Sequence, residues 1–361
     1  MASNDVGFHD HVVLGTFSTD EDQNYCNDLR NRRFFVEPDD RPNFDLLHGI
    51  DDYVDRDHSG VQPTSLTPVL EWIRDHQKEL KEKGIMKPAG KGPEMKLDVD
   101  FVARRGILAR LLRAGNDAEE VDLMVTRYHG TYYLEGVKDL RLNEAPQPLG
   151  FGGKKFQQYV TSVDGGQPDI DQPIYASSSY YSITKGKCGD HTFLFSGETV
   201  AERKDAVERP PMNYVDVKTN KDLSEYRLKQ NFIRYKTLRW WSQNHISGVS
   251  DIVVGWRDDK RNVVTSTEMM KNEDLPNKAV GQGFWDPELC VSNFLSLVAD
   301  IRKKIPDDDP SAVFCMGLKK LEIRRDIRRQ LKARRFSFRR KEDDYVILKD
   351  WYLRDVLKVP E

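Results

Sequence analysis

The stretch Asn213–Lys221 reads NYVDVKTNK, in which apolar residues alternate with charged ones until polar residues end the run. This alternation predicts a β-strand, because successive side chains of a strand point to opposite faces. Asp216 and Lys218 are two residues apart and therefore share one face. A carboxylate beside an ammonium is an ordinary ion pair in most strands. The same pair also occurs where a protein holds a metal ion next to a phosphate, so both interpretations stay open at this point.

A second acid, Glu198, lies near the end of the preceding strand candidate, FLFSGETV (193–200). The 17 residues between Glu198 and Asp216 allow a hairpin-like return, which predicts carboxylates on neighbouring strands. Nucleases that use Mg²⁺ or Mn²⁺ need several carboxylate oxygens around the metal and a cation near the phosphate. An acid-x-Lys pattern by itself is common in strands, and alone it favours the ion pair.

Composition describes a protein with a large core and a heavily charged surface. The chain has 361 residues, of which 38% are hydrophobic and 32% charged. No run approaches the ~18 to 20 apolar residues of a membrane span, and the N-terminus lacks the features of a secretory signal, so we expect neither a membrane protein nor a secreted one. Four scattered cysteines form no CxxC, which favours a reducing compartment and argues against a structural zinc site.

Charge is distributed unevenly along the chain. The net charge is −3, but residues 319–341 carry twelve Lys or Arg against two acids, which leaves −13 for the rest. Such a basic segment fits contact with a polyanion, and it fits a solvated helix face equally well.

The pattern of elements predicts an α+β fold of one domain over residues 1–361, with mixed β-sheets wrapped by helices. Residues 1–65 are expected to be rich in loops, and 153–160 to be a short helix start or a strand. Helices are expected near 65–84, 97–114, 222–246, 286–304 and 349–357; strands at 125–137, 173–184, 191–200, 213–221, 312–318, 336–340 and 344–348; and a hairpin at 251–267. Gly130 within 125–137 suggests a bulge or a close backbone approach. Residues 319–335 stay ambiguous, although apolar residues four apart favour a helix.

Several further motifs, taken in order, resemble the DXO family of decapping exonucleases. VARRGIL (102–108) places Arg105 in a basic segment, and Lys236, Trp240 and Gln243 share one helix face. The segments LGTFSTDEDQNY, PNFDLLHGI and RYHGTYYLE look like the N-terminal half of that family. GKKFQQY resembles its GYKFEQY motif, LFSGETV its LFSGEVD, YVDVKT its YVELKT, and LRWWSQNHISGV its WWAQSFLPGV segment. The resemblance covers most of the chain and fades after about residue 300.

The resemblance implies a fold with a D-(D/E)xK-nuclease-like core and activity on RNA 5′ ends with incomplete caps, noncanonical caps or 5′ triphosphates. It also implies a nuclear location, Mg²⁺ or Mn²⁺ as cofactor, and a 5′–3′ exoribonuclease or another RNA-processing protein as partner.

Residue by residue, the resemblance assigns RNA-end binding to Arg105 and places Glu198, Lys218 and Gln243 at site positions of the family. Asp216 stands at the glutamate position of E-x-K, beside the metal-binding backbone carbonyl of Val217. Two positions depart from the family pattern. Gln157 replaces the metal-binding glutamate of GYKFEQY, and Val200 replaces the aspartate that bridges the two metals.

These replacements predict a degenerate metal site. Gln157 keeps a neutral carbonyl oxygen, and Val200 offers no ligand. Glu202 shares the parity of Val200, but it lies ~6.6 Å further along a continuing strand, too far to substitute. We therefore expect weak or absent hydrolysis, with RNA 5′-end binding through Arg105, Lys218 and Gln243. The alternatives are an active decapping nuclease with one metal and a protein-interaction scaffold in an RNA-processing complex.

Overall fold

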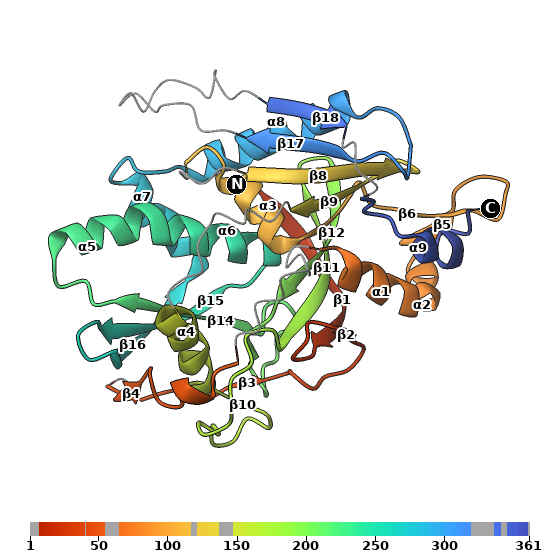
Figure 1. Ribbon diagram of the computed structural model, residues 1–361. Coiled ribbons are helices and arrows are strands. Elements are labelled where there is room, and N and C mark those ends of the chain that lie inside the picture. Colours follow the sequence, from red (N-terminus) through yellow and green to blue (C-terminus); the bar gives the residue numbers. More distant parts are fainter. Residues whose placement is uncertain are drawn as a thin grey trace.

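The computed structural model describes residues 7–39, 41–54, 65–116, 121–136, 147–318, 336–340 and 345–359. Two mixed β-sheets form its frame, and helices pack against both of them (Figure 1). The predicted α+β class with mixed sheets wrapped by helices is confirmed. Within the described part of the chain, no helix is both long enough and apolar enough to cross a membrane.

The larger sheet has nine strands, in the order β18-β17-β8-β9-β7-β12-β11-β1-β2. Their bounds are Phe336–Arg340 (β18), Phe314–Leu318 (β17), Val121–Tyr128 (β8), Thr131–Gly136 (β9), Phe101–Arg104 (β7), His191–Glu198 (β12), Ser179–Cys188 (β11), Phe8–Thr19 (β1) and Tyr25–Cys26 (β2). The short strand β7 runs parallel to both β9 and β12 at the centre of the sheet, and the flanking pairs are antiparallel.

The second sheet has seven strands, in the order β10-β3-β13-β14-β15-β16-β4. Their bounds are Thr161–Ser162 (β10), Phe34–Phe35 (β3), Ala201–Glu202 (β13), Tyr214–Lys221 (β14), Asp251–Asp258 (β15), Val263–Lys271 (β16) and Phe44–Asp45 (β4). β14 pairs in parallel with β15, and β15 and β16 form the predicted hairpin. A separate two-stranded sheet joins β5 (Met86–Pro88) and β6 (Met95–Leu97).

Helices cover both sheets. Their bounds are Thr67–Asp75 (α1), Gln77–Glu82 (α2), Arg105–Arg113 (α3), Gln147–Tyr159 (α4), Tyr226–Asn231 (α5), Thr237–Ser247 (α6), Leu275–Val280 (α7), Pro287–Lys304 (α8) and Asp350–Asp355 (α9), with 3₁₀ turns at Ile50–Asp52 and Asn272–Asp274. A π-helical segment, Phe232–Lys236, connects α5 to α6. The residues at the start of α8 explain why the helix begins there. The Asp286 side chain caps it by accepting hydrogen bonds from two backbone N–H groups, and Pro287 follows in the first turn.

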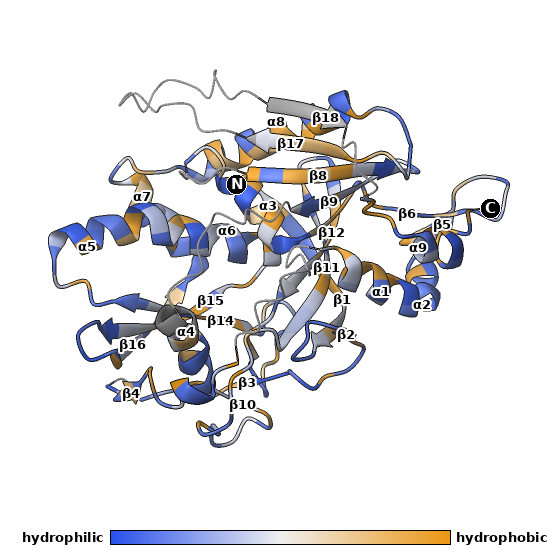
Figure 2. Ribbon diagram, in the orientation of Figure 1, coloured by the Kyte–Doolittle hydropathy of each residue, from blue (hydrophilic) through white to orange (hydrophobic). Residues whose placement is uncertain are grey.

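The largest hydrophobic cluster contains side chains from both sheets. Phe193 of the nine-stranded sheet and Ile252 of the seven-stranded sheet belong to it, together with Leu108, Trp241 and Phe294 from the helices. A second cluster includes Trp72 and Tyr352, and a third lies between α4 and the seven-stranded sheet. Figure 2 shows the hydrophobic colouring along β8 and the polar colouring of α2 and α5, in line with this division between inside and outside.

Four expectations about local structure are wrong. Residues 97–114 are not one helix, because Phe101–Arg104 forms β7 before α3 begins. Residues 125–137 are not one strand: His129 and Gly130, with φ of 48° and 80°, make a turn between β8 and β9. The helix expected at 65–84 breaks at His76 into α1 and α2. Residues 345–348 form no strand.

The sequence prediction also named two segments, the N-terminal part (1–65) and the basic segment (319–341). In the N-terminal part, β1 spans twelve residues, and the described residues between 20 and 54 contain only two-residue strands and one 3₁₀ turn. Of the basic segment 319–341, only the backbone of β18 lies within the described residues.

Candidate functional site

The predicted site residues gather where the chain passes from one sheet to the other. β12 ends at Glu198 in the nine-stranded sheet, and β13 begins at Ala201 in the seven-stranded sheet. β13 then pairs antiparallel with β14, which carries Asp216. The expected hairpin-like return that would make the strands of Glu198 and Asp216 neighbours is therefore wrong. The two acids belong to different sheets.

The carboxylate of Asp216 is almost completely enclosed, with 8% of the residue exposed. Its Oδ1 accepts a hydrogen bond of 2.9 Å from the backbone N–H of Val217 and lies 3.1 Å from Lys218 Nζ. Its Oδ2 accepts a hydrogen bond of 2.9 Å from Asn244 Nδ2 on α6. The ion pair predicted from NYVDVKTNK is thus present, and both carboxylate oxygens already have protein partners.

Lys218 and Gln243 meet, as the sequence resemblance implied. Lys218 Nζ donates to Gln243 Oε1 at 3.3 Å, which ties β14 to α6. Arg105 Nη1 donates to the backbone carbonyl of Glu198 at 3.0 Å and lies 3.5 Å from Ser247 Oγ, one turn along α6 from Gln243. Gly197 allows this approach, because a Cβ there would stand 3.2 Å from Arg105 Cδ.

The side chain of Glu198 has a partner that sequence reasoning missed. Lys154 Nζ on α4 donates to Glu198 Oε1 at 2.8 Å, and Ser179 Oγ donates to the same oxygen at 3.1 Å. The Lys154 ammonium, against the opposing effect of burial, holds the pKa of the Glu198 carboxyl at about 2. The signal was present in GKKFQQY, where Lys154 stands at the tyrosine position of GYKFEQY.

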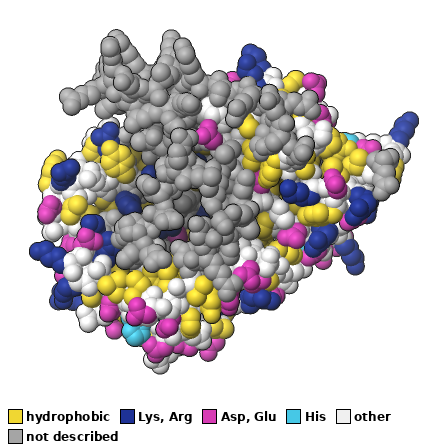
Figure 3. All heavy atoms as spheres, viewed as in Figure 1, with side chains coloured by type: hydrophobic (Ala, Val, Ile, Leu, Met, Phe, Trp, Pro, Cys, Tyr) yellow, Lys and Arg dark blue, Asp and Glu magenta, His cyan; other side chains and the backbone are white. Residues whose placement is uncertain are grey.

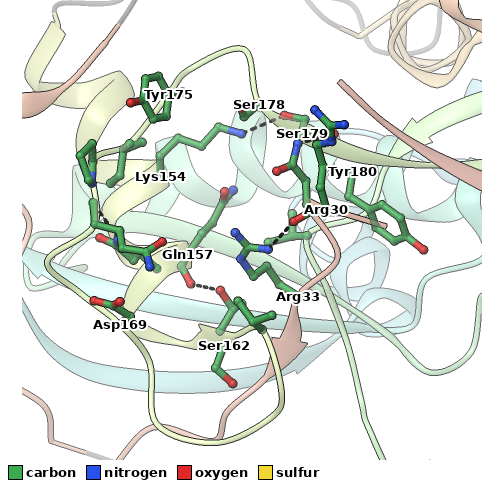
Figure 4. Close-up of a pocket in the computed structure, with 18 of the residues that line it drawn as sticks. Arg30, Arg33, Lys154, Gln157, Ser162, Asp169, Tyr175, Ser178, Ser179 and Tyr180 are labelled. Atoms are coloured by element: carbon green, nitrogen blue, oxygen red, sulfur yellow. Dashed lines mark hydrogen bonds between the residues drawn. The ribbon is translucent and has the colours of Figure 1, made fainter. Parts of the chain in front are cut away.

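A cavity of about 720 Å³ opens beside this pair. Among the predicted residues, Gln157, Glu198 and Val200 line it together with Lys154, whereas Asp216, Lys218 and Gln243 do not. Figure 4 shows Lys154 extending across the cavity toward Ser179, with Gln157 and Arg33 directed into it. Further acids line the same cavity: Asp20, Glu21, Asp22, Asp164 and Asp169.

Arg33 is the other cation that the sequence interpretation did not single out. Its Nη1 donates to the backbone carbonyls of Arg30 and Arg32, at 3.1 and 2.9 Å, and it forms no ion pair with any acid of the described residues. Burial lowers the pKa of this guanidinium. A partly buried guanidinium whose acceptors are neutral carbonyls has a positive charge that no acid balances, and such a charge favours an anionic ligand.

The residues present do not fit a site for two divalent metals. No group of three or more His, Cys, Asp or Glu side chains within the described residues is placed to hold a metal ion. Glu198 is engaged by Lys154, Asp216 by three donors, and the side chain of Val200 carries no metal ligand. Glu202 is not a substitute, because it is buried in an ion pair of 2.7 Å with Arg32. Mg²⁺ and Mn²⁺ favour free carboxylate and carbonyl oxygens, and among the predicted site residues that line the cavity only Gln157 has a polar side chain without a hydrogen-bond partner in the described part of the chain.

Lys218 is one of several cations near Lys236. Partial burial, followed by the charges of Arg239, Arg257 and Lys218, lowers the pKa of Lys236. Figure 3 shows Lys and Arg side chains along the left flank of the molecule, over α5 and the β15–β16 hairpin. Trp240, which shares a helix face with Lys236, is buried in the core.

Comparisons with known proteins identify the family of this chain. The family model described as RAI1 like PD-(D/E)XK nuclease matches residues 12–353. The decapping and exoribonuclease protein of Mus musculus is 30% identical over 314 residues, covering 83% of this chain and 76% of that protein. Its Homo sapiens counterpart is 30% identical over 317 residues, with the same shares covered.

Solved structures show the same fold. Rai1 of Scheffersomyces stipitis, in complex with (3'-NADP)+ and calcium ion, has a TM-score of 0.72 at 19% identity, covering 87% of this chain and 86% of that one. Rai1 of Candida albicans, in complex with pU5-Mn2+, has a TM-score of 0.72 at 15% identity, covering 94% and 91%. With the family match over nearly its whole length, this chain belongs to the RAI1-like PD-(D/E)XK nuclease family of decapping enzymes.

Proposed function

We propose that this protein binds RNA 5′ ends and that its hydrolysis of them is weak or lost. One observation carries the proposal: Glu198, the only acid of the predicted site that lines the cavity, is paired with Lys154, while Val200 and Gln157 stand beside it. The 5′ ends that the family resemblance suggests are those with incomplete or noncanonical caps or a triphosphate, in RNA quality control.

The chemistry of the family explains why hydrolysis would suffer. A two-metal mechanism stabilises the attacking and the leaving oxygens through two closely spaced ions, and each ion needs carboxylate ligands. A site with one amide, one valine and two acids that already have partners supports at most one loosely held metal. Catalysis by this route would lose its main source of charge stabilisation.

Binding needs no metal. Arg105 uses Nη1 on a backbone carbonyl and a hydroxyl, which leaves other guanidinium N–H groups for phosphate oxygens. Lys218 and Gln243, which are hydrogen-bonded to each other, add a second set of donors. Replacing two carboxylates by an amide and a valine also makes the site less negative, which favours an RNA phosphate without an intervening cation.

Location and partner are part of the proposal, and the family resemblance supports them. Curated relatives carry the names decapping and exoribonuclease protein and decapping nuclease RAI1, and the Candida albicans structure holds pU5-Mn2+. We place this protein in the nucleus, beside a 5′–3′ exoribonuclease or another RNA-processing protein, where it protects or presents an RNA 5′ end.

Restoring the missing carboxylates tests the proposal. The purified protein and its Gln157→Glu/Val200→Asp variant are incubated with 5′-triphosphate, capped and monophosphate RNA in Mn²⁺. The expected result is an inert parent that binds all three RNAs and a variant that releases product. Hydrolysis by the parent, abolished by Asp216→Ala, would overturn the proposal.

An active enzyme with one metal remains the second candidate, because Asp216, Val217 and Lys218 keep their places on β14. Calorimetric titration with MnCl₂ separates the two: the second candidate requires saturable binding by the parent, and the first does not. Arg105→Ala and Lys218→Ala variants separate RNA binding from a pure protein-interaction scaffold, which would leave RNA affinity unchanged.

A further inference from the structure

Two consecutive lysines of α4 point in different directions. Lys154 Nζ lies 2.8 Å from Glu198 Oε1 and 3.3 Å from Ser179 Oγ, on the wall of the cavity. Lys155 Nζ instead donates to Gln158 Oε1 at 2.9 Å and to the backbone carbonyl of Ile170, and it does not line the cavity. The register of α4 therefore delivers one ammonium to the predicted site and keeps the other away.

Each acid of the predicted site has its own lysine. Lys154 Nζ forms an ion pair with Glu198 Oε1 at 2.8 Å, and Lys218 Nζ forms one with Asp216 Oδ1 at 3.1 Å. Arg105 adds a positive charge, because the acceptors of its guanidinium are a carbonyl and a hydroxyl. Lys154 therefore neutralises Glu198 on the cavity wall before any metal is bound, and a phosphate there would contact this ammonium although Asp20, Glu21, Asp22, Asp164 and Asp169 also line the cavity.

Lys154 also has bonding capacity left over. An ammonium carries three N–H donors, and two of these are used by Glu198 and Ser179. About a quarter of the side chain is exposed, at 24%. The third donor thus lies at a position that solvent or a ligand in the cavity reaches.

We propose that Lys154 is the resident cation of this cavity: it binds the terminal phosphate of an RNA 5′ end directly and, through its hold on Glu198, excludes a divalent metal. This inference rests on the proposed function and adds the group that recognises the phosphate. It makes recognition of the 5′ phosphate independent of Mg²⁺ or Mn²⁺.

The first test measures binding with metal removed. Fluorescence anisotropy in EDTA compares a 5′-phosphorylated oligouridine with its 5′-hydroxyl counterpart for the full-length protein and for Lys154→Met, Lys154→Arg and Lys155→Met. The parent is expected to prefer the phosphorylated RNA, and Lys154→Met to lose that preference, with a loss of affinity of about tenfold and a salt slope shallower by about 0.7. Lys154→Arg keeps the charge and restores the preference. Lys155→Met, the matched control on the same helix, retains it.

The second test measures metal binding. Calorimetry with MnCl₂ compares the Gln157→Glu/Val200→Asp variant with the same variant carrying Lys154→Met. Removal of the ammonium is expected to tighten Mn²⁺ binding by at least about tenfold, because Glu198 then has a free carboxylate.

The outcomes separate the two proposals. If the parent binds no RNA, the proposed function fails. If the parent discriminates the 5′ phosphate in EDTA and Lys154→Met does so equally well, only the role of Lys154 is wrong. Discrimination by the parent only after Mn²⁺ is added also overturns the role of Lys154. Should Lys154→Met fail to fold, Lys154→Gln supplies the same comparison with a neutral side chain of similar length.

Discussion

At the scale of single residues, Asp216 shows how a side chain one carbon shorter than glutamate changes a site. Its carboxylate lies close enough to its own strand for Oδ1 to accept a hydrogen bond from the Val217 N–H. The other oxygen, Oδ2, accepts a hydrogen bond from Asn244 Nδ2. A buried carboxylate with three donors is part of the structural framework, because loss of the acid leaves those donors unsatisfied.

Replacement of Asp216 by alanine is therefore expected to destabilise the protein. Loss of the buried acceptor should lower the free energy of unfolding by about 2 to 3 kcal/mol, measured by urea denaturation at neutral pH. Asp98→Ala, which removes an exposed ion pair of 2.7 Å with Lys87, is the control and should cost under about 1 kcal/mol. An increase in stability for Asp216→Ala would instead indicate an acid repelled by like charges, as in an open metal site.

The sequence drew attention to Gln157 and Val200, but it did not reveal the lysine beside them. Gln157 and Val200 were identified because ordered motifs align them with acids, and both do line the cavity. Lys154 was missed because a KK pair does not reveal which lysine faces inward. That choice depends on the helical register of α4, and the sequence left even the helical state of this segment open.

At the scale of elements, α4 is positioned by the ring of Phe156 against β15. A Cβ at Gly255 would stand 2.8 Å from Phe156 Cζ and 2.9 Å from its Cε2, closer than atoms in ordinary contact. Gly255 therefore provides the space that lets α4 settle on the sheet and carry Lys154 and Gln157 to the cavity.

Gly255→Ala is expected to displace α4. Overpacking should cost about 1 to 3 kcal/mol of unfolding free energy, measured by urea denaturation, and affinity for 5′-phosphorylated RNA should fall with it. Gly153→Ala is the matched control, because a Cβ there meets no atom within 4 Å and alanine is the better helix former. A stable Gly255→Ala protein with unchanged RNA affinity would show that the position of α4 does not depend on this contact.

The contact between β1 and α6 should make stability depend on pH. Phe8 N–H donates to His245 Nε2 at 3.0 Å, and Trp241 stacks on the same imidazole. Burial, followed by the charges of His11 and His9 on β1, lowers the pKa of His245 to about 4 from an ordinary 6.5. Between pH 6.5 and pH 4, His245 is protonated in the unfolded chain but neutral in the folded one. The free energy of unfolding is therefore highest above pH 6.5 and decreases as the pH falls toward 4.

The expected size of this loss is about 2 to 3 kcal/mol between pH 7 and pH 4. His245→Gln keeps an acceptor for Phe8 but does not titrate, so its unfolding free energy should vary less over this range by about 2 kcal/mol. Urea denaturation at several pH values measures this. His48→Gln, an exposed histidine paired with Asp171, is the control and should retain the parent's pH profile. An unchanged profile for His245→Gln would exclude His245 as the titrating group.

The elements that the sequence predicted well are those with a long, regular period. α8 and the β15–β16 hairpin lie where the pattern placed them. The strand β7 was read as helix because its first three residues, Phe101–Ala103, are all fully buried at the centre of the sheet and show no alternation. Ile347 and Leu348 are apolar because they enter the second hydrophobic cluster from a loop, which local sequence cannot distinguish from a strand.

At the scale of the whole molecule, the cavity exists because the chain changes sheets between Glu198 and Ala201. Each sheet also pairs strands that are separated in sequence, β7 with β12 in the larger sheet and β14 with β15 in the smaller one. Neither pairing follows from periodicity, because each depends on long-range contacts. Their consequence is that both sheets contribute to one large hydrophobic cluster.

The shared cluster predicts that the described sheets unfold together, although a chain of 361 residues is long enough for two domains. Differential scanning calorimetry should give one transition whose calorimetric and van't Hoff enthalpies agree.

Ile252→Ala removes a fully buried side chain of the seven-stranded sheet that belongs to the shared cluster. It should cost about 2 to 5 kcal/mol and shift the whole transition to lower temperature without splitting it. Hydrogen exchange should then quicken in β12 as well as in β15, because the loss is transmitted through the common core. Two resolved transitions, or faster exchange confined to the seven-stranded sheet, would mean that the sheets are separate cooperative units and that the cavity between them opens independently of global unfolding.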